Sequence, residues 1–304
     1  MSFWFTGNYA PFRAGLFRTA ENGPGPKSAS ASGFGPSLGW CGTLEVRLAT
    51  TAREIRKAQR LRYKVFFEEG GAQPDRTASL IRRDVCEFDR ICDHLIVIDH
   101  AARSKLGRLK PRVVGTYRLL RQDVAQANSG FYSAGEFDIA PMLAAHDGLN
   151  FLELGRSCVA KNWRGKRTLE LLWRGLWAYV RHHRVDVMFG CASLPGTSPL
   201  ALAAPLGFLQ AHARAEGEWE VSGWPGRCLP AGMVSAPAIN PRKALAALPP
   251  LIKAYLRCGA KFSTSAVIDW HFGTIDVLAI MPVADISEKY IAHFGGEAGE
   301  RAAA

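Results

Sequence analysis

The segment from residue 151 to residue 167 combines a glutamate, a glycine and a dense run of cations. Glu153 and Arg156 lie on a predicted strand at its start. A short basic loop follows and leads into a predicted helix; its cradle residues are Arg164, Gly165, Lys166 and Arg167. Backbone N–H groups at a helix N-terminus attract anions, and the cations add full charges. Taken alone, these residues fit either a phosphate-binding cradle or a plain turn with solvated side chains.

Motifs elsewhere in the chain resemble known acyltransferases. The strand–loop–helix at 151–167 resembles the acyl-CoA-binding core of the acetyltransferase-like (GNAT) superfamily. Acyl-homoserine-lactone synthases, a branch of that fold, are similar at residues 62–66, 87–95, 114–119 and 153–156. The L-ornithine Nα-acyltransferases are more similar still, at residues 168–179, 186–193, 248–257 and 272–277. The resemblance covers residues 44–295.

This resemblance implies a fold, a reaction and a donor. The fold would be α/β, with a GNAT-like mixed sheet. The reaction would move a 3-hydroxylated fatty acyl group from acyl carrier protein to the α-amine of ornithine, giving lyso-ornithine lipid. No cofactor would be bound, because the donor is a phosphopantetheine thioester. Arg167 stands where the GNAT loop has a small residue, which favours the single phosphate of a carrier-bound arm over coenzyme A. Acyl length and the choice of ornithine over lysine or glutamine stay open.

Amide formation from a thioester needs a proton acceptor for the amine and polarisation of the carbonyl. Glu153 is the candidate base, and Arg156 the second catalytic candidate. On an ideal strand the two side chains point to opposite faces. The resemblance implies a bulge, which Gly155 could host, that turns both toward one cleft. The alternative is a buried structural carboxylate paired with Arg156 or Arg118.

Four more charged residues are candidates for binding the amino acid. Asp89 and Asp93 could hold ammonium groups, since carboxylates form charge-assisted hydrogen bonds with them. Arg62 and Arg118 could bind the substrate carboxylate or fix those aspartates. A purely structural ion-pair network is the alternative.

Two other patterns are weaker. His94 and Asp99 match the His-x4-Asp of glycerolipid O-acyltransferases, but positions five apart on a strand face opposite ways. Cys86, Cys92 and His94 lack a fourth ligand at a usable spacing, so we expect no metal site.

Composition bounds the partners and the compartment. The net charge of +11 favours an acidic partner, and we expect acyl carrier protein rather than nucleic acid, because no aromatic-interleaved basic patch occurs. Seven cysteines without a CxxC pair indicate reduced thiols. The sequence has neither a secretory signal nor an apolar run of the ~18 residues that a membrane span needs. We therefore expect a cytoplasmic protein that contacts the inner face of a membrane peripherally, if at all.

The domain prediction has four parts. Residues 1–42, rich in Gly, Pro, Ser and Ala near their end, are predicted to be a disordered tail. Residues 43–240 would form the acyltransferase core, residues 241–295 a C-terminal extension packed on it, and residues 296–304 a disordered tail. Within the core, an apolar stripe predicts a helix over 167–183, and a second helix is predicted over 243–257. The rival functions are an acyl-homoserine-lactone synthase and the O-acyltransferase that His94 and Asp99 suggest.

Overall fold

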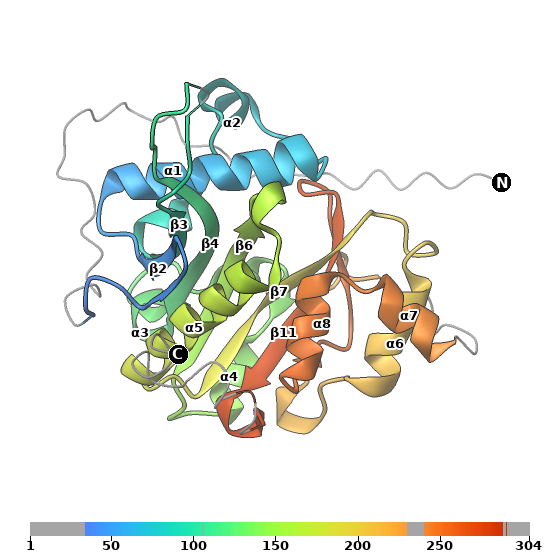
Figure 1. Ribbon diagram of the computed structural model, residues 1–304. Helices are drawn as coiled ribbons and strands as arrows, with labels where there is room; N and C mark the ends of the chain where they lie inside the picture. The colour runs from blue at the N-terminus through green and yellow to red at the C-terminus, as the bar shows by residue number, and fades with distance from the viewer. Residues whose placement is uncertain (1–33, 105, 230–239, 288–289, 291–304) are drawn as a thin grey trace.

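The computed structural model describes residues 34–104, 106–229, 240–287 and 290. Within them, nine strands form one sheet in the order β1-β2-β3-β4-β6-β7-β11-β10, and β9 pairs with β11 (Figure 1). Neighbouring strands are antiparallel except β6 and β7, which are parallel. The strands are β1 Gly39–Cys41, β2 Leu44–Leu48, β3 Asp93–Asp99, β4 Arg112–Arg121, β6 Phe151–Val159, β7 Val187–Pro195, β9 Lys261–Phe262, β10 Val267–Asp269 and β11 Thr274–Pro282. A separate ladder joins β5 (Phe137–Asp138) to β8 (Ser222–Gly223).

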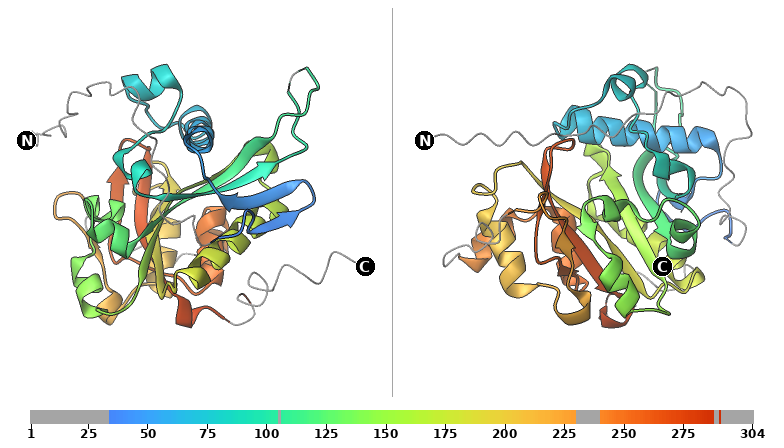
Figure 2. Two further views of the ribbon diagram at one scale, coloured as in Figure 1. Left: turned by 90° about the vertical axis from the view of Figure 1, so that its left-hand side faces the viewer. Right: turned by 180° about the vertical axis from the view of Figure 1, so that it is seen from behind.

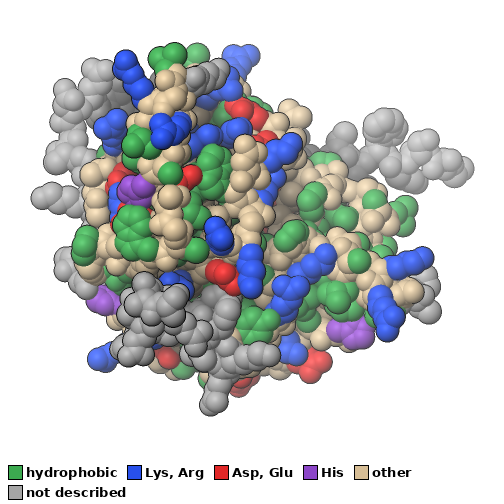
Figure 3. Space-filling model, in the orientation of Figure 1, with side chains coloured by type: hydrophobic (Ala, Val, Ile, Leu, Met, Phe, Trp, Pro, Cys, Tyr) green, Lys and Arg blue, Asp and Glu red, His purple; other side chains and the backbone are tan. Residues whose placement is uncertain are grey.

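Helices cover both faces of this sheet (Figure 2). On one face lie α5 (Lys166–His182) and α8 (Pro250–Arg257); on the other lie α1 (Ala52–Tyr63) and α4 (Ala140–Ala145). The remaining α-helices are α2 Arg76–Ile81, α3 Gln122–Gln126, α6 Ala203–His212 and α7 Pro241–Ala247. The surface over α5 and α8 carries many Lys and Arg side chains and fewer Asp and Glu side chains (Figure 3). Among the described helices, none is both long enough and apolar enough to cross a membrane.

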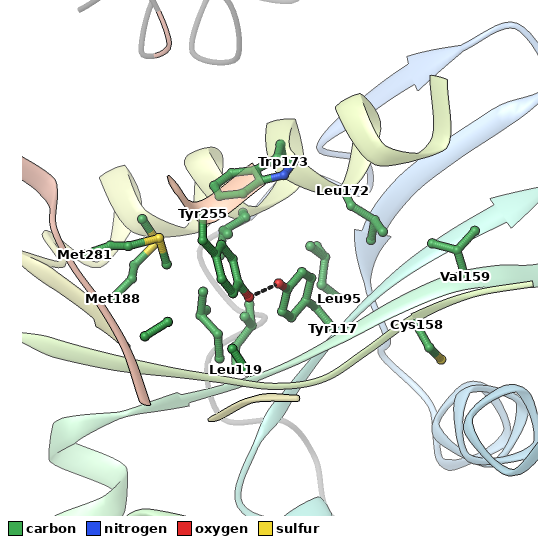
Figure 4. Packing of buried hydrophobic residues seen from close by; sticks show 14 of the residues in the cluster. Leu95, Tyr117, Leu119, Cys158, Val159, Leu172, Trp173, Met188, Tyr255 and Met281 are labelled. Carbon is green, nitrogen blue, oxygen red and sulfur yellow. Dashed lines mark hydrogen bonds between the residues drawn. The ribbon is translucent and has the colours of Figure 1, made fainter. Parts of the chain in front are cut away.

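The predicted α/β mixed sheet is confirmed, and its core follows from the sequence pattern. Helix α5 begins one residue before the predicted start and buries Leu172, Trp173 and Leu176 on one stripe. These side chains pack against the sheet beside Tyr255 of α8 (Figure 4). The hydroxyls of Tyr117 in β4 and Tyr255 hydrogen-bond within this apolar layer, so neither phenol is buried without a partner.

Two predicted boundaries were wrong at the residue level. The chain is ordered before residue 43, because β1 pairs with β2 from Gly39 to Cys41. The predicted helix over 243–257 is divided into α7 and α8 at Pro249 and Pro250, since a proline lacks the N–H and restricts the residue before it. The remainder of the N-terminal tail, up to residue 33, and the predicted tail at 296–304 lie outside the described residues.

Residues 241–287 are not an extension packed on a finished core. Strand β11 pairs with β7 along its whole length, from Thr274↔Pro195 to Pro282↔Val187. It also pairs with β9 and β10, so it lies inside the sheet. The reason is physical: without β11, the edge of β7 would present a row of unpaired backbone groups. The core and the C-terminal segment therefore form one sheet.

The two parallel strands separate partway along their length. β6 and β7 pair only from Phe151↔Val187 to Glu153↔Phe189. Beyond that point β6 stays with β4 and β7 stays with β11. Gly190 lies where they part, and a Cβ there would stand 2.2 Å from the carbonyl oxygen of Leu154. Glycine at this position therefore allows the close approach that precedes the opening.

A bulge on β6 follows at once. Arg118 is opposite Gly155 and Thr116 is opposite Cys158, so two residues of β6 face one residue of β4. Arg156 in the bulge has a φ of 52°, in the left-handed region. The bulge predicted beside Gly155 is thus present, and the residue that takes the unusual conformation is the arginine.

We predict that Gly190→Ala destabilises the fold, because the added methyl must displace the Leu154 backbone. The expected loss is about 1–3 kcal/mol of unfolding free energy, as for other overpacked sites. Urea denaturation measures it, with Gly35→Ala as the control, since a Cβ at Gly35 would meet only one atom, at 3.9 Å. Equal stability of the two variants would contradict this account of the strand separation.

Candidate active site

A cavity of about 480 Å³ occupies the gap between β6 and β7. Its wall includes residues of β4, β6, β7, α8 and β11, and of the loop that precedes β11. The π-helical turn η2 (Lys64–Glu69), which continues α1, adds Val65, Phe66 and Glu69. Such turns recur at functional sites because they push side chains out of the regular helical register. The cavity is therefore the candidate active site.

Glu153 lines this cavity and is held rigidly. Its side chain is 4% exposed. Its carboxylate accepts hydrogen bonds from the backbone N–H groups of Tyr132 (2.9 Å) and Ser133 (2.6 Å). These two N–H groups lie at the start of the 3₁₀ turn η4 (Tyr132–Gly135). The residue before the turn, Phe131, provides no side-chain hydrogen bond to cap it. Glu153 thus fixes η4 against the sheet and still faces the cavity.

Arg156, which lies in the bulge, lines the same cavity. Its guanidinium carbon lies 4.8 Å from the ring centre of Tyr132 and 4.5 Å from that of Phe272. Its Nε lies 3.3 Å from the carboxylate of Asp84. Two aromatic faces and one carboxylate therefore hold a buried cation at the opening. The structure brings Glu153 and Arg156 together, as the predicted bulge requires.

Arg62 and Asp89 are placed elsewhere, in a buried ion network behind the cavity. Arg62 is fully buried and binds Asp89 with two parallel hydrogen bonds of 2.8 and 2.7 Å. Its Nε also lies 2.8 Å from the Asp84 carboxylate. Neither Arg62 nor Asp89 is among the residues that line the cavity. Their geometry fits the structural alternative, in which they order the loop that carries Asp84.

Arg118 connects this network to the cavity. Its Nη1 lies 3.5 Å from Asp89 and donates to the sulfur of Cys86 at 2.7 Å. It also stands over the ring of Tyr132, 5.3 Å from the centre, and lines the cavity. Arg118 therefore presents a positive charge to the cavity from the network.

Asp93 does not join the candidate site. It is buried on β3, where its carboxylate accepts a hydrogen bond of 2.7 Å from the hydroxyl of Tyr179 in α5. It therefore faces α5, whereas Asp89 lies in the network beside α1. The four-residue spacing between the two aspartates misled the prediction, because a 3₁₀ turn at Glu87–Arg90 ends before the strand begins at Asp93.

The basic loop lies at the edge of the cavity. Arg164 donates to the carboxylate of Glu69 at 2.5 Å, and Glu69 lines the cavity. Gly165 is the N-cap of α5, with no side chain to satisfy the first N–H groups of that helix. Lys166 and Arg167 are exposed in the first turn. The loop therefore offers N–H groups and cations beside the cavity, as the sequence predicts, and a Cβ at Gly165 would meet no atom within 4 Å.

His94 and Asp99 are not a pair. The Nε2 of His94 contacts the Asp89 carbonyl oxygen at 3.1 Å. Asp99, at the other end of β3, accepts hydrogen bonds from Thr43 and Trp163. The strand-parity argument against an O-acyltransferase dyad is therefore confirmed.

Sequence reasoning missed an acidic group on the cavity side of η4. Glu136, Asp269 and Asp276 place one carboxylate oxygen each within 4.8 Å of the others. Burial, followed by the charges of Asp276 and Asp269, raises the pKa of Glu136 to about 8. Burial also raises the pKa of Asp276 to about 6. More than 130 residues separate Glu136 from Asp269, so no local spacing could have indicated this group.

Cys191 lies between the acidic group and η4. Its sulfur is 3.4 Å from the Ser133 hydroxyl and 3.7 Å from the Glu136 carboxylate. Burial, with the nearby Glu136, raises the pKa of this thiol well above its usual value. A thiol that stays protonated is a poor nucleophile, so the geometry favours direct transfer over an acyl-cysteine intermediate.

Comparison with known proteins identifies the family of this chain. Residues 61–174 match the acetyltransferase (GNAT) domain family. An L-ornithine N(alpha)-acyltransferase of Agrobacterium fabrum is 50% identical over 273 residues, covering 90% of this chain and 92% of that protein. Proteins of the same name from Rhizobium meliloti and Brucella abortus are each 48% identical, over 90% and 86% of this chain and 91% and 92% of their own.

Two solved structures resemble this chain at low structural similarity and low sequence identity. One is FeeM, an N-acyl amino acid synthase from uncultured soil microbes, with a TM-score of 0.43 and 11% identity, covering 79% of this chain and 91% of that one. Another is the AHL synthase LasI, with a TM-score of 0.42 and 13% identity, covering 83% and 95%.

The separated parallel strands, the bulge and the matched domain define this chain as an acyltransferase of the GNAT class. Curated relatives that are 42–50% identical over most of the chain identify the family within this class. The chain belongs to the L-ornithine Nα-acyltransferase family.

We predict that Arg62→Lys strongly destabilises the protein. A lysine cannot reproduce the two-pronged contact with Asp89, which leaves buried carboxylates without full compensation. Removing one partner of a buried ion pair costs about 3–5 kcal/mol of unfolding free energy. The lysine keeps its positive charge, so the expected loss for Arg62→Lys is smaller than that. Arg60→Lys, in the same helix but exposed, is the matched control in urea denaturation. Similar unfolding midpoints for the two variants would show that the network is dispensable.

We also predict that Glu136→Gln gains stability relative to the wild type as pH rises. The folded pKa of about 8 exceeds the unfolded value of ~4.3, so the folded protein holds the extra proton between these values. Stability from this group is therefore complete at low pH and falls as pH rises toward 8. Melting temperatures at pH 5, 6.5 and 8 measure the difference, with the exposed Glu216→Gln as the control. A difference between Glu136→Gln and the wild type that does not change with pH would refute the prediction.

Proposed function

We propose that this protein transfers a 3-hydroxylated fatty acyl group from acyl carrier protein to the α-amine of L-ornithine. The product would be lyso-ornithine lipid, and the reaction would be the first step of ornithine lipid synthesis. Family membership supports the acceptor. One structural observation carries the chemistry: Glu153 and Arg156 face a single cavity that opens between two parted strands, with a basic loop at its edge.

The reaction joins the amine nitrogen to the thioester carbonyl carbon and breaks the bond from that carbon to sulfur. The ammonium must first lose a proton, and the nitrogen loses a second as the tetrahedral intermediate collapses. We assign Glu153 as the acceptor, directly or through one water. Two backbone N–H groups hold its carboxylate in place, and each carboxylate oxygen keeps a further lone pair. The departing pantetheine sulfur takes up one of the two protons, and Glu153 passes the other to solvent, so the protons balance.

Arg118 and Arg156 supply the positive charge that the substrates need. We propose that one or both bind the α-carboxylate of the amino acid, because a guanidinium presents paired N–H donors to a carboxylate. Arg156 also faces the region where the thioester oxygen gains charge, since the bulge at residues 156–157 lies on the free edge of β6. Apolar side chains such as Phe66, Leu154 and Leu251 line the same cavity and can cover the start of the acyl chain.

The carrier protein would dock at the basic loop. Arg164, Lys166 and Arg167 stand beside the cavity, at the open N-terminus of α5. A phosphate on the pantetheine arm would meet N–H groups and cations there. The surface rich in Lys and Arg around α5 and α8 (Figure 3) suits the acidic face of a carrier. The product carries an apolar tail, so we propose that the enzyme works in the cytoplasm and releases product at the inner membrane face.

The test is a mass-resolved assay of the full chain. The protein is incubated with 3-hydroxyacyl carrier protein and, in separate reactions, ornithine, S-adenosylmethionine or a lysolipid; acyl-coenzyme A replaces the carrier in a parallel set. Amide-linked acyl-ornithine formed from the carrier supports the proposal. A lactone from S-adenosylmethionine, or an ester from the lysolipid, would overturn the acceptor. Equal rates with acyl-coenzyme A would overturn the donor.

We predict that Glu153→Gln lowers turnover by about 10²–10⁴-fold, the usual range for loss of a general base. The carrier should bind the variant with little change, because Glu153 lies away from the basic loop. Stability should also fall by about 1–3 kcal/mol, since the amide nitrogen would face a backbone N–H. Steady-state kinetics, carrier titration and urea denaturation measure the three effects, with Glu216→Gln as the control. Unchanged turnover in a folded variant would remove Glu153 as the base.

A further inference from the structure

The cavity is lined by charges of both signs. Arg118, Arg156 and Glu153 line it. Asp269 and Asp276 line it as well, and Glu136 adds a third carboxylate to them. The three residues come from separate places in the chain: the end of η4, the end of β10, and β11. Only the tertiary fold brings these negative charges together.

Asp276 is 4% exposed, and it lines the cavity. One oxygen of the Asp276 carboxylate, Oδ1, has no hydrogen-bond donor among the described residues, whereas the hydroxyls of Thr274 and Ser193 act on the same carboxylate. A buried carboxylate oxygen left in this state is costly unless a ligand supplies the donor. The atom therefore points to a donor, preferably a charged one, that enters the cavity with the substrate.

Glu153 and the acidic group are connected through η4. Glu153 accepts from the N–H of Ser133 at the start of η4, and Glu136 follows directly after its end. The Cys191 sulfur lies 3.4 Å from the Ser133 hydroxyl and 3.7 Å from the Glu136 carboxylate. Glu153 and Asp276 line the same cavity, so a diamino acid bound there has a carboxylate available for each amine.

We propose that Glu136, Asp269 and Asp276 bind the side-chain ammonium of the amino-acid acceptor and thereby select a diamino acid. The inference rests on the proposed N-acylation and extends it to the residues that choose the substrate. Three carboxylates offer three acceptors to the three N–H bonds of one ammonium. The α-amine is then left at Glu153, so the same contact decides which of the two amines is acylated.

The spacing of the group accommodates an ammonium. Charge-assisted N–H···O bonds of about 2.8 Å place acceptors around an ammonium ~4.6 Å apart, and the three oxygens lie within 4.8 Å of one another. A divalent metal ion is the other occupant that three carboxylates can hold, and the chelator experiment below separates the two. One Asp269 oxygen already accepts from the backbone N–H groups of His271 (2.8 Å) and Phe272 (3.0 Å).

Repulsion among the three carboxylates also favours a bound cation. Burial, together with the neighbouring carboxylates, raises the pKa of both Glu136 and Asp276. The other groups that act on Glu136 are Asp269, Cys191 and Arg227, and those that act on Asp276 are Asp269, Arg156, Thr274 and Ser193. A bound ammonium would favour the ionised carboxylates. Selection for the diamino acid should therefore strengthen as pH rises from about 6 to 8.

The experiment compares L-ornithine with L-norleucine, in which a methyl group replaces the side-chain ammonium. Both carry the same α-amine and carboxylate, so norleucine is an internal control for the chemistry. For the wild type, kcat/KM should favour ornithine at least ~100-fold. Asp276→Asn should abolish most of this preference by raising KM for ornithine, while norleucine turnover changes little. Asp285→Asn, exposed on the surface, is the matched control.

Three outcomes would overturn the inference. Equal losses for both amino acids would assign Asp276 a structural role. An unchanged preference would show that the group does not contact the side chain. Inhibition of the wild type by a chelator, with recovery on adding Mg²⁺ or Mn²⁺, would assign the group to a metal ion. If Asp276→Asn does not fold, Asp269→Asn is used, because asparagine keeps the oxygen that accepts from His271 and Phe272.

A binding measurement separates this inference from the proposed function. Ornithine should raise the melting temperature of the wild type more than norleucine does, and Asp276→Asn should remove the difference. If ornithine stabilises the wild type in this way but no donor acylates it, the proposed reaction is wrong and the proposed binding site stands. Acylation of ornithine without any dependence on Asp276 would retain the reaction and overturn the site.

Discussion

The separation of β6 from β7 is the constraint on which the rest of the site depends. Two parallel strands normally pair along their length, and here pairing ends after Glu153↔Phe189. Each strand keeps its other neighbour, so the sheet stays continuous around the gap. Gly190 permits the close approach before the gap, and the bulge at Arg156 turns β6 away after it. A substrate cavity can therefore pass through the sheet without breaking it.

The arginine side chains around this gap are held by carboxylates and aromatic rings. Arg62 and Asp89 pair outside the lining of the cavity, and Arg118 connects their network to the wall. Arg156 is enclosed between two aromatic rings and Asp84. Such interlocked pairs hold the guanidinium groups in position before a substrate arrives. Preorganised charge of this kind is what stabilises a developing oxyanion.

Much of this architecture was predictable from the sequence. The amphipathic stripe of α5, the glycine in the basic loop and the strand that carries Glu153 were all located within a residue or two. Local patterns record such features because burial of one face fixes the spacing of apolar residues. Errors arose where the outcome depended on contacts between residues that are far apart in the sequence. Asp93 was grouped with Asp89 as a second carboxylate for ammonium groups, although it faces α5. Residues 241–295 were taken for an extension, although β11 completes the sheet.

The sequence by itself determined the mixed sheet, the strand–loop–helix unit and the identity of Glu153 and Arg156 as neighbours across a glycine. Only the tertiary structure decided which charged residues share the cavity. It removed Arg62, Asp89 and Asp93 from the wall. It added Asp269 and Asp276 to the wall and placed Glu136 beside them. The reason is that backbone periodicity acts over a few residues, whereas the acidic group forms only when β10, β11 and η4 meet across the folded sheet.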